Sequence, residues 1–340
     1  MKFYLFLFFL LINSCAWNQK ELDQLEDFQA GKGNELLDQL DLQKDVVDKF
    51  RVEKTENPKE KKINKKVSPQ RKKIAQKIIR THQQEVRISE EYPKQYTEFD
   101  EKSVKLWKKF KPVFSPGETI VYDVTYTGIT IGKVATAVTA LTRIQNKDVF
   151  YFAGKLKSAP FYSYIYEIDD TIESYVTKDE FLPVKFSLIQ KESNKTVNDL
   201  QLFDREELKT YYRYKKTKKG NSSFKKKDEF IPEYFQDSFS SVYFLRGIDF
   251  KVGDKFQFPI VTRGKIWIMD IDVVGIDALE TEIGKRQAYK INVITRYEGD
   301  MVKSGVLNLW LAKDETKIML KFKAEVKLGS ISGDIISYQK

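Results

Sequence analysis

The chain has 340 residues, with 59 Lys plus Arg, 49 Asp plus Glu and a formal net charge of +10. Its single Cys excludes an internal disulfide bond and a Cys-based zinc site, and its single His excludes a His-rich metal site. The 24 Phe and 18 Tyr residues favour β-sheet. The length fits two domains of average size or one large β domain.

The first residues have the layout of a secretory signal. Lys2 precedes the apolar run Phe3–Ile12, and small residues follow before Cys15. Ten apolar residues are too few to span a bilayer, which needs about 20 residues in a helix. The order Leu11-Ile12-Asn13-Ser14-Cys15 resembles the signal box of bacterial lipoproteins.

This resemblance implies a specific modification. In that family the Cys sulfur receives a diacylglyceryl group, the chain is cut before the Cys, and the new amine is acylated, for example with palmitate. Residues 1–14 would be the signal peptide and Cys15 the lipidation site. Ala16, in place of the Asp that retains some lipoproteins at the inner membrane, favours the outer membrane, facing the periplasm. The alternative is an ordinary signal peptide with an incidental Cys.

Residues 15–112 are predicted to be a lipid-anchored, charged linker that is partly helical or disordered. Residues 54–87 carry twelve Lys or Arg against three Glu. Such a run is commonly a solvated segment. It could also bind anionic lipid or cell-wall polymer. The export signal argues against nucleic acid, and His82, within this run, is not expected to be catalytic.

Residues 113–340 are predicted to be an antiparallel β domain. From Thr119 onward, apolar and polar residues alternate in short runs separated by turn residues such as Arg263-Gly264 and Gly220-Asn221. This pattern is typical of a β-sandwich or of an open or closed β-barrel. The predicted strands are 119–127, 130–141, 148–157, 164–177, 182–190, 196–204, 208–216, 255–262, 265–275, 278–283, 287–298, 302–312, 317–326 and 330–338.

One helix is predicted over residues 236–246, because Phe239, Val242 and Leu245 give a helical stripe. Asp237 would be its N-cap and Gly247 its C-terminal cap. A single helix among many strands is expected to plug a barrel end or to pack on the concave side of the sheet.

Several blocks of this region together resemble a bacterial family, the domain of unknown function 3108. The blocks are Phe114-Ser115-Pro116-Gly117-Glu118, Tyr166-Glu167-Ile168-Asp169-Asp170, the segment from Asp237 to Arg246, Val252-Gly253-Asp254 and Leu309-Trp310-Leu311-Ala312-Lys313-Asp314. The resemblance implies an exported, often lipid-anchored and mostly β protein. It implies no chemistry.

Candidate ligand-binding residues are aromatic or cationic. Tyr162, Tyr164 and Tyr166 would share one strand face, where they could line a sugar or lipid groove or simply pack across strands. Arg246 could stabilise the helix end, pair with an acid such as Asp170, or bind an anionic head group. Trp267 could be a core residue or a ligand contact.

A basic hairpin tip is predicted around Gly220-Asn221. Its Lys residues could protect a sheet edge from pairing or bind anionic glycan or lipid; they include Lys215, Lys216, Lys218 and Lys219.

Catalysis is not expected. The globular part lacks His and Cys, which excludes Ser-His, Cys-His and His-metal schemes. The neighbouring Asp169 and Asp170 should point to opposite faces of a strand, and Asp314-Glu315 should lie in a turn. No metal site or cofactor is predicted.

The sequence therefore predicts a non-enzymatic, lipid-anchored cell-envelope protein whose β domain binds an amphiphilic ligand or an envelope polymer. One alternative is a structural or assembly module that binds another envelope protein. Another is a glycan hydrolase that uses two carboxylates.

Overall fold

The structure is a computed structural model that describes residues 25–26, 28, 32–53, 92–297, 300–326 and 328–340. The predicted signal peptide 1–14, the predicted lipidation site Cys15 and the basic residues 54–87, with His82, lie outside the described residues.

Fifteen strands form one antiparallel sheet, which confirms the mainly β, antiparallel prediction. The strand order is β10-β11-β12-β13-β14-β15-β1-β2-β4-β5-β6-β7-β8-β9, and β3 pairs with β4. The strands are β1 Thr119–Tyr126, β2 Ile129–Val138, β3 Thr142–Ile144, β4 Lys147–Ser158, β5 Asp169–Thr177, β6 Pro183–Glu192, β7 Lys195–Asp204, β8 Lys209–Lys218, β9 Asn221–Phe230, β10 Lys255–Thr262, β11 Lys265–Thr281, β12 Gly284–Tyr297, β13 Asp300–Ala312, β14 Met319–Val326 and β15 Gly329–Gln339.

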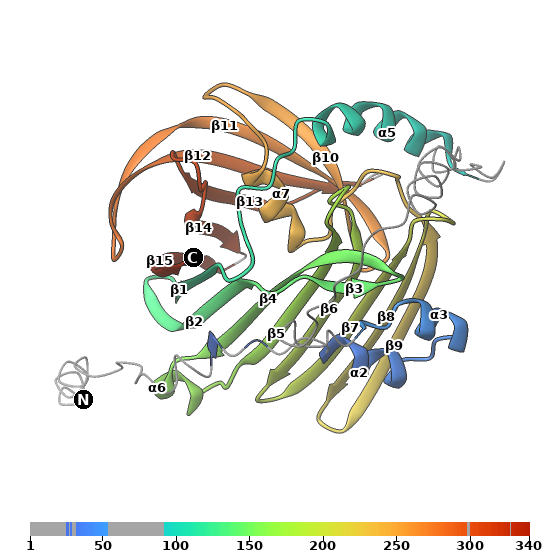
Figure 1. Cartoon of the computed structure of the whole chain (residues 1–340). Helices are drawn as coiled ribbons and strands as arrows, with labels where there is room; N and C mark the ends of the chain where they lie inside the picture. Colours follow the sequence, from blue (N-terminus) through green and yellow to red (C-terminus); the bar gives the residue numbers. More distant parts are fainter. Residues whose placement is uncertain (1–24, 27, 29–31, 54–91, 298–299, 327) are drawn as a thin grey trace, which may run out of the picture.

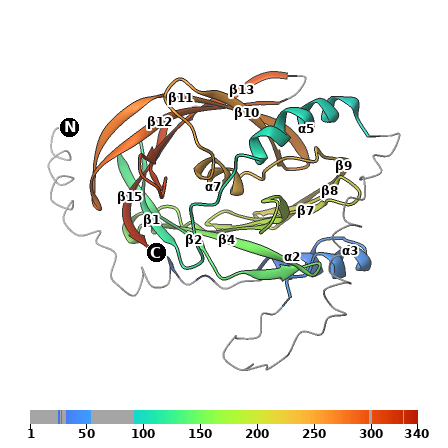
Figure 2. The same ribbon diagram turned by 45° about the horizontal axis from the view of Figure 1, so that its top comes forward.

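The sheet curls into an open barrel. Its last strand, β15, pairs with its first, β1, in the middle of the strand order, whereas β9 and β10 are the two ends. Figures 1 and 2 show the curled sheet surrounding helix α7 (Ser240–Arg246), as expected for the one predicted helix. The prediction differs in detail at three strands: 265–275 and 278–283 are the single strand β11, and neither β3 nor β9 was among the predicted strands.

The interior of the curl is filled mainly by aromatic rings. The ring centroids of Phe152 and Tyr243 lie 4.1 Å apart, and Phe114 packs edge-on against both rings. Phe244 of α7 packs against Phe258 of β10, with ring centroids 5.1 Å apart. These contacts hold α7 against opposite parts of the sheet, because aromatic side chains bury large areas in specific pairings.

Gly247 is the C-cap of α7, as predicted, but the N-cap is Phe239 and not the predicted Asp237, which lies two residues earlier. The Asp237 carboxylate accepts hydrogen bonds from the backbone N–H groups of Phe239 and Ser240, both 2.8 Å long, and Ser240 Oγ accepts one from Asp237 N–H. Gly247 has a φ of −81°, so it is not a left-handed cap. Glycine is required there because a Cβ would overlap the Phe110 ring.

The described parts of residues 15–112 are largely helical, in agreement with the predicted partly helical linker, but they pack on the β domain. Helices α2 (Lys32–Gln39) and α3 (Lys44–Lys49) lie on the outer face of the sheet (Figure 2). The apolar side chains of this segment are buried against those of the sheet. The segment contributes Leu36, Leu37, Leu40 and Phe50, and the sheet contributes Tyr151, Tyr175, Leu200 and Leu202. The apolar residues Leu36, Leu37 and Leu40 therefore form the face by which this segment packs on the sheet.

Helix α5 (Lys94–Trp107) also packs on the β domain. The ring centroid of Trp107 lies 4.1 Å from that of Phe244, and Asp100 accepts hydrogen bonds from Glu233 N–H and Tyr234 N–H. The charged and the alternating parts of the sequence meet at position 113, but the described residues on both sides of it pack together in one body. None of the described helices is both long enough and apolar enough to cross a bilayer.

Candidate functional site: a cleft where the ends of the sheet meet

The two ends of the sheet approach each other at the β10–β11 turn. Lys227 of β9 donates a hydrogen bond from Nζ to the carbonyl oxygen of Gly264, with a length of 2.9 Å. On the other side of β10, Gln236 forms a parallel bridge with Ile260. The ends are joined by these contacts and not by a strand ladder between β9 and β10, so a gap in the sheet is left beside them.

A cleft of about 970 Å³ lies beside this junction, and we call it the seam cleft. One wall is apolar and is contributed by Ile172, Phe186 and Leu188 of β5 and β6. The other walls come from β7 to β11 and from Ser238, and their lining residues are Asp199, Tyr212, Phe224, Lys225, Lys226, Lys227, Thr262, Arg263, Lys265 and Trp267.

Strand β7 places a carboxylate in this cleft because both of its faces are buried. Leu200 and Leu202 belong to the cluster under α2 and α3 on the outer face. Asp199 and Phe203 alternate with them and face the inside of the curl, since side chains along a strand alternate between its two faces.

Asp199 is the buried acid of the cleft. Its side chain is 3% exposed, its Oδ1 has no hydrogen-bond partner among the described residues, and its Oδ2 lies 3.8 Å from Arg263 Nε. Burial raises the pKa of Asp199 to about 7, although the positive charge of Arg263 opposes this shift. A buried carboxyl oxygen without a hydrogen-bond partner is costly, which makes Asp199 a candidate for contact with a ligand.

Cationic groups surround the opening of the cleft. The Arg263 side chain is largely exposed, and Lys225, Lys226, Lys227 and Lys265 also line the cleft. Apolar walls, a cationic opening and one protonatable acid together suit a ligand with an apolar body and an anionic head group.

The structure places one predicted ligand-binding residue in the cleft. Trp267 lines it, and the Trp267 ring packs against Tyr297 with centroids 5.2 Å apart. The predicted basic hairpin is formed by β8 and β9, with its turn at Lys219 and Gly220, both at positive φ. Lys215, Lys216, Lys218 and Lys219 lie on β8 and this turn, outside the lining of the cleft.

The prediction that Tyr162, Tyr164 and Tyr166 share a strand face is wrong. Pro160–Ser163 forms the short helix α6, and β5 begins only at Asp169. Proline is favoured in the first turn of a helix, and the hydrogen bond from Tyr166 N–H to the Tyr162 carbonyl continues the turn. None of the three tyrosines lines the seam cleft.

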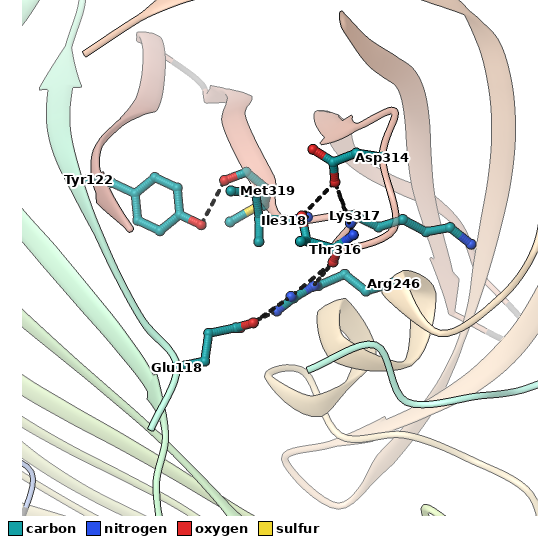
Figure 3. A network of polar contacts seen from close by, with 8 residues as sticks. All are labelled: Glu118, Tyr122, Arg246, Asp314, Thr316, Lys317, Ile318 and Met319. Atoms are coloured by element: carbon teal, nitrogen blue, oxygen red, sulfur yellow. Dashed lines mark hydrogen bonds and ion pairs between the residues drawn. The ribbon is translucent and has the colours of Figure 1, made fainter. Parts of the chain in front are cut away.

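Arg246 is not a ligand-binding residue of the seam cleft, and its partner is not Asp170 (Figure 3). Its guanidinium makes two hydrogen bonds with the Glu118 carboxylate, of 2.6 and 2.9 Å, and a third with the carbonyl oxygen of Thr316. Both charged side chains are 1% exposed. This bidentate pair ties α7 to the start of β1 and to the β13–β14 turn, so its role is structural.

The other carboxylates considered in the sequence also have local partners. Asp170 accepts hydrogen bonds from Gln190 Nε2 and Lys191 N–H, and Asp314 accepts one from Thr316 N–H within its turn. Glu173 is buried beneath α2, where it accepts hydrogen bonds from Gly33 N–H and Tyr151 OH. In the described part of the chain, no three His, Cys, Asp or Glu side chains are placed to hold a metal ion.

Sequence reasoning missed most of the cleft, including Asp199, Tyr212 and Arg263. Leu200 and Leu202 suggest that their face of β7 is the core and that Asp199 faces solvent. The signal that could have corrected this is the apolar pattern of Leu36, Leu37 and Leu40, which covers the outer face of the sheet.

Comparisons with known proteins place the chain in a family. The family model described as "Protein of unknown function (DUF3108)" matches residues 121–336. No curated protein matches the sequence significantly.

Three solved structures resemble the fold. A β-barrel-like protein of the domain of unknown function DUF1849 from Brucella abortus has a TM-score of 0.42 at 11% identity, covering 65% of this chain and 96% of that one. A candidate lipoprotein from Parabacteroides distasonis has a TM-score of 0.31 at 10% identity, covering 68% and 99%. A candidate exported protein with a YmcC-like fold from Bacteroides fragilis has a TM-score of 0.31 at 9% identity, covering 68% and 99%. The family model, in contrast, spans nearly the whole sheet from β1 to β15, and the chain belongs to the DUF3108 family of proteins of unknown function.

Proposed function

We propose that this protein is a non-catalytic, lipid-anchored protein of the bacterial cell envelope that binds an amphiphilic ligand with an anionic head group in the seam cleft. The observation that carries the proposal is the buried carboxyl of Asp199, whose Oδ1 has no hydrogen-bond partner among the described residues and which faces a cleft with one apolar wall and a cationic opening. Attachment to the outer membrane through Cys15, facing the periplasm, is proposed from the signal box alone.

The apolar part of the ligand would lie against Ile172, Phe186 and Leu188. A volume of about 970 Å³ is at the upper end of the range for small-molecule sites, which suits a chain of many carbon atoms. Trp267 adds a flat ring at the opposite side, where it can pack along an acyl or polyprenyl chain.

The head group would lie at the cationic opening. Arg263 and Lys265 can each bind a phosphate or carboxylate oxygen there. Asp199, with its pKa raised to about 7, is largely protonated at slightly acidic pH and can then donate a hydrogen bond to the same anion. At higher pH its carboxylate would repel an anionic head group, so binding should weaken as the pH rises above about 7.

The composition of the cleft also supports a binding role over hydrolysis. Asp199 is the single carboxylate among the lining residues of the seam cleft, and no His lines it. Glycoside hydrolysis generally needs two carboxyl groups across the scissile bond. A binding protein needs only the apolar wall and the fixed charges.

The test is native mass spectrometry of the full-length protein purified gently from a bacterial envelope fraction, with the organic extract analysed in parallel. A stoichiometric amphiphile is expected on the wild-type protein and on the control variant Lys323→Gln, whose Lys is exposed on β14. The double variant Arg263→Gln/Lys265→Gln should lose most of this adduct. An unadorned mass for every protein, or an adduct that the double variant retains in full, would contradict the proposal.

A titration supplies the independent measurement. Lysophosphatidylglycerol, which has one acyl chain and a phosphate head group, should change the fluorescence of the wild-type protein. This change should largely disappear in Trp267→Phe, because Trp267 is the tryptophan among the lining residues of the cleft.

A further inference from the structure

Five large apolar side chains are exposed on neighbouring turns of the sheet. Their exposed fractions are 66% for Ile129, 58% for Phe161, 90% for Tyr164, 69% for Ile165 and 80% for Leu328. Scattered exposed apolar residues need no explanation, but a cluster of this kind marks an interaction surface.

These residues lie on three connections at one end of adjacent strands. Strands β14, β15, β1, β2, β4 and β5 are consecutive in the sheet, so the β14–β15 turn, the β1–β2 turn and the β4–β5 connection with α6 share one end. Two hydrogen bonds join them: Tyr126 OH donates to the Leu328 carbonyl, and Ala159 N–H donates to the Ile131 carbonyl. We call this surface the apolar rim (residues 124–132, 158–166 and 328–333).

The three segments of the apolar rim contain no Asp, Glu, Lys or Arg, although 32% of the residues in the whole chain are charged. The nearest charged residues border these segments in the sequence, among them Lys157, Glu167 and Lys327. Exposed turns of a protein surrounded by water on all sides would be expected to carry charge at least as often as the average residue. The absence of charge together with exposed aromatic and aliphatic side chains indicates an apolar partner.

The start of the described chain places the proposed anchor near this rim. Leu25 is fully buried against Val121, Ala135 and Ile336, on the outer face of β1, β2 and β15. Ten residue steps separate Cys15 from Leu25, and such a length of chain spans at most about 35 Å. The five-residue distance along β1 from Val121 to Tyr126 is only about 17 Å. An acylated Cys15 can therefore lie in the same plane as the rim.

We propose that the apolar rim contacts the lipid bilayer and inserts its side chains into the interfacial layer. The tyrosines suit this position, because Tyr combines an apolar ring with a polar tip and is enriched at membrane interfaces. The seam cleft plays no part in this contact, and the contact itself does not require the lipid on Cys15, which only brings the rim to the membrane.

The test uses the mature chain, residues 15–340, with Cys15→Ser, so that neither the apolar run Phe3–Ile12 nor an acyl anchor is present. The vesicles are of phosphatidylcholine, which does not attract the basic residues 54–87 electrostatically. Tyr164→Trp places a reporter on the rim, and Val274→Trp places a matched reporter at an exposed apolar position on β11. Vesicles with brominated acyl chains should quench the added fluorescence of Tyr164→Trp and leave that of Val274→Trp unchanged. Equal quenching of both, or of neither, would overturn the proposal.

A partition measurement gives the second arm. The triple variant Ile129→Ser/Ile165→Ser/Leu328→Ser should bind these vesicles at least about tenfold more weakly than its parent, since three aliphatic side chains lose their transfer into the apolar layer. The control Val274→Ser/Ile276→Ser should bind as the parent does. Loss of self-association in the triple variant, without any change in vesicle binding, would assign the rim to a protein partner and overturn the membrane contact.

Discussion

Replacing Asp199 by Asn should stabilise the ligand-free protein, and the gain should grow with pH. The substitution keeps the shape of the side chain and removes the ionisation of a carboxyl that is buried without a hydrogen-bond partner for Oδ1. In the folded protein burial raises the pKa of Asp199 to about 7, against an ordinary value of 3.8 for an exposed Asp.

The sign follows from proton binding. Between about pH 4 and pH 7 the folded state holds a proton on Asp199 that the unfolded state has released, so the stability of the wild-type protein falls as the pH rises through this window. The cost is complete above about pH 7, where a shift of about three pKa units corresponds to about 4 kcal/mol. From pH 5 to pH 8 the part of this cost that appears is about 2.5 kcal/mol.

The assay is urea unfolding at pH 5 and pH 8, followed by far-ultraviolet circular dichroism, on wild type and Asp199→Asn after removal of bound lipid. The difference in unfolding free energy between the two proteins cancels the other titrating groups. This difference should widen in favour of the variant by about 2.5 kcal/mol between the two pH values. Thr196→Ala, an exposed substitution on the same strand that changes no ionisable group, should show no such widening.

A difference that stays constant from pH 5 to pH 8 would contradict this prediction, because Asp199 would then titrate alike in both states. A variant that loses stability relative to the wild type as the pH rises would contradict it too, since the carboxylate would then be stabilised by its surroundings. The same variant should bind lysophosphatidylglycerol with an affinity that no longer falls as the pH passes 7.

Four further substitutions test contacts that hold the helices against the sheet. Glu118→Gln and Arg246→Met should each lower the free energy of unfolding in urea by about 3–5 kcal/mol, because each leaves one buried charge without its partner. The double variant should lose less than the sum of the two single losses, and additive losses would exclude coupling between the two side chains. Gly33→Ala should cost about 1–3 kcal/mol, because the new Cβ would lie 2.8 Å from Glu173 Oε2, and hydrogen exchange should rise selectively in α2; unchanged exchange would contradict this contact. Asp237→Ala should lower the melting temperature through the loss of about 1–2 kcal/mol of capping, and an unchanged melting temperature would show that the cap contributes little.

Most strands were predictable because their alternation of apolar and polar residues is independent of tertiary context. Residues 119–127 alternate clearly, and β1 spans Thr119–Tyr126. Strand β9 escaped prediction because Lys225, Lys226 and Lys227 interrupt its pattern. A strand at the end of the sheet buries little of its surface, so its sequence is free to carry charge on both faces.

The site was harder to predict because it depends on which distant elements meet. Pairing with an acid was one of three roles considered for Arg246, but the acid proves to be Glu118, 128 positions earlier in the chain, and not Asp170. No local period reports such a pairing. Asp199 was missed for a related reason. Helices α2 and α3 cover the outer face of β7, where Leu200 and Leu202 lie, so the opposite face with Asp199 is the one that points into the curled sheet.

The docked N-terminal segment changes how the protein would stand on its membrane. A free linker from residue 16 to 112 would separate its ends by about 55 Å, as a coil of that length does. Instead, Leu25 and residues 32–53 pack on the sheet, which leaves about ten residues between Cys15 and the body. The basic residues 54–87 then follow Glu53, which bridges to Arg143, and precede Tyr92, which donates a hydrogen bond to the carbonyl oxygen of Ile231. Because both flanks of this run are attached to the same β domain, the run would not be the tether of an anchor at Cys15. Any attraction of these residues to an anionic surface would act on the orientation of the whole domain.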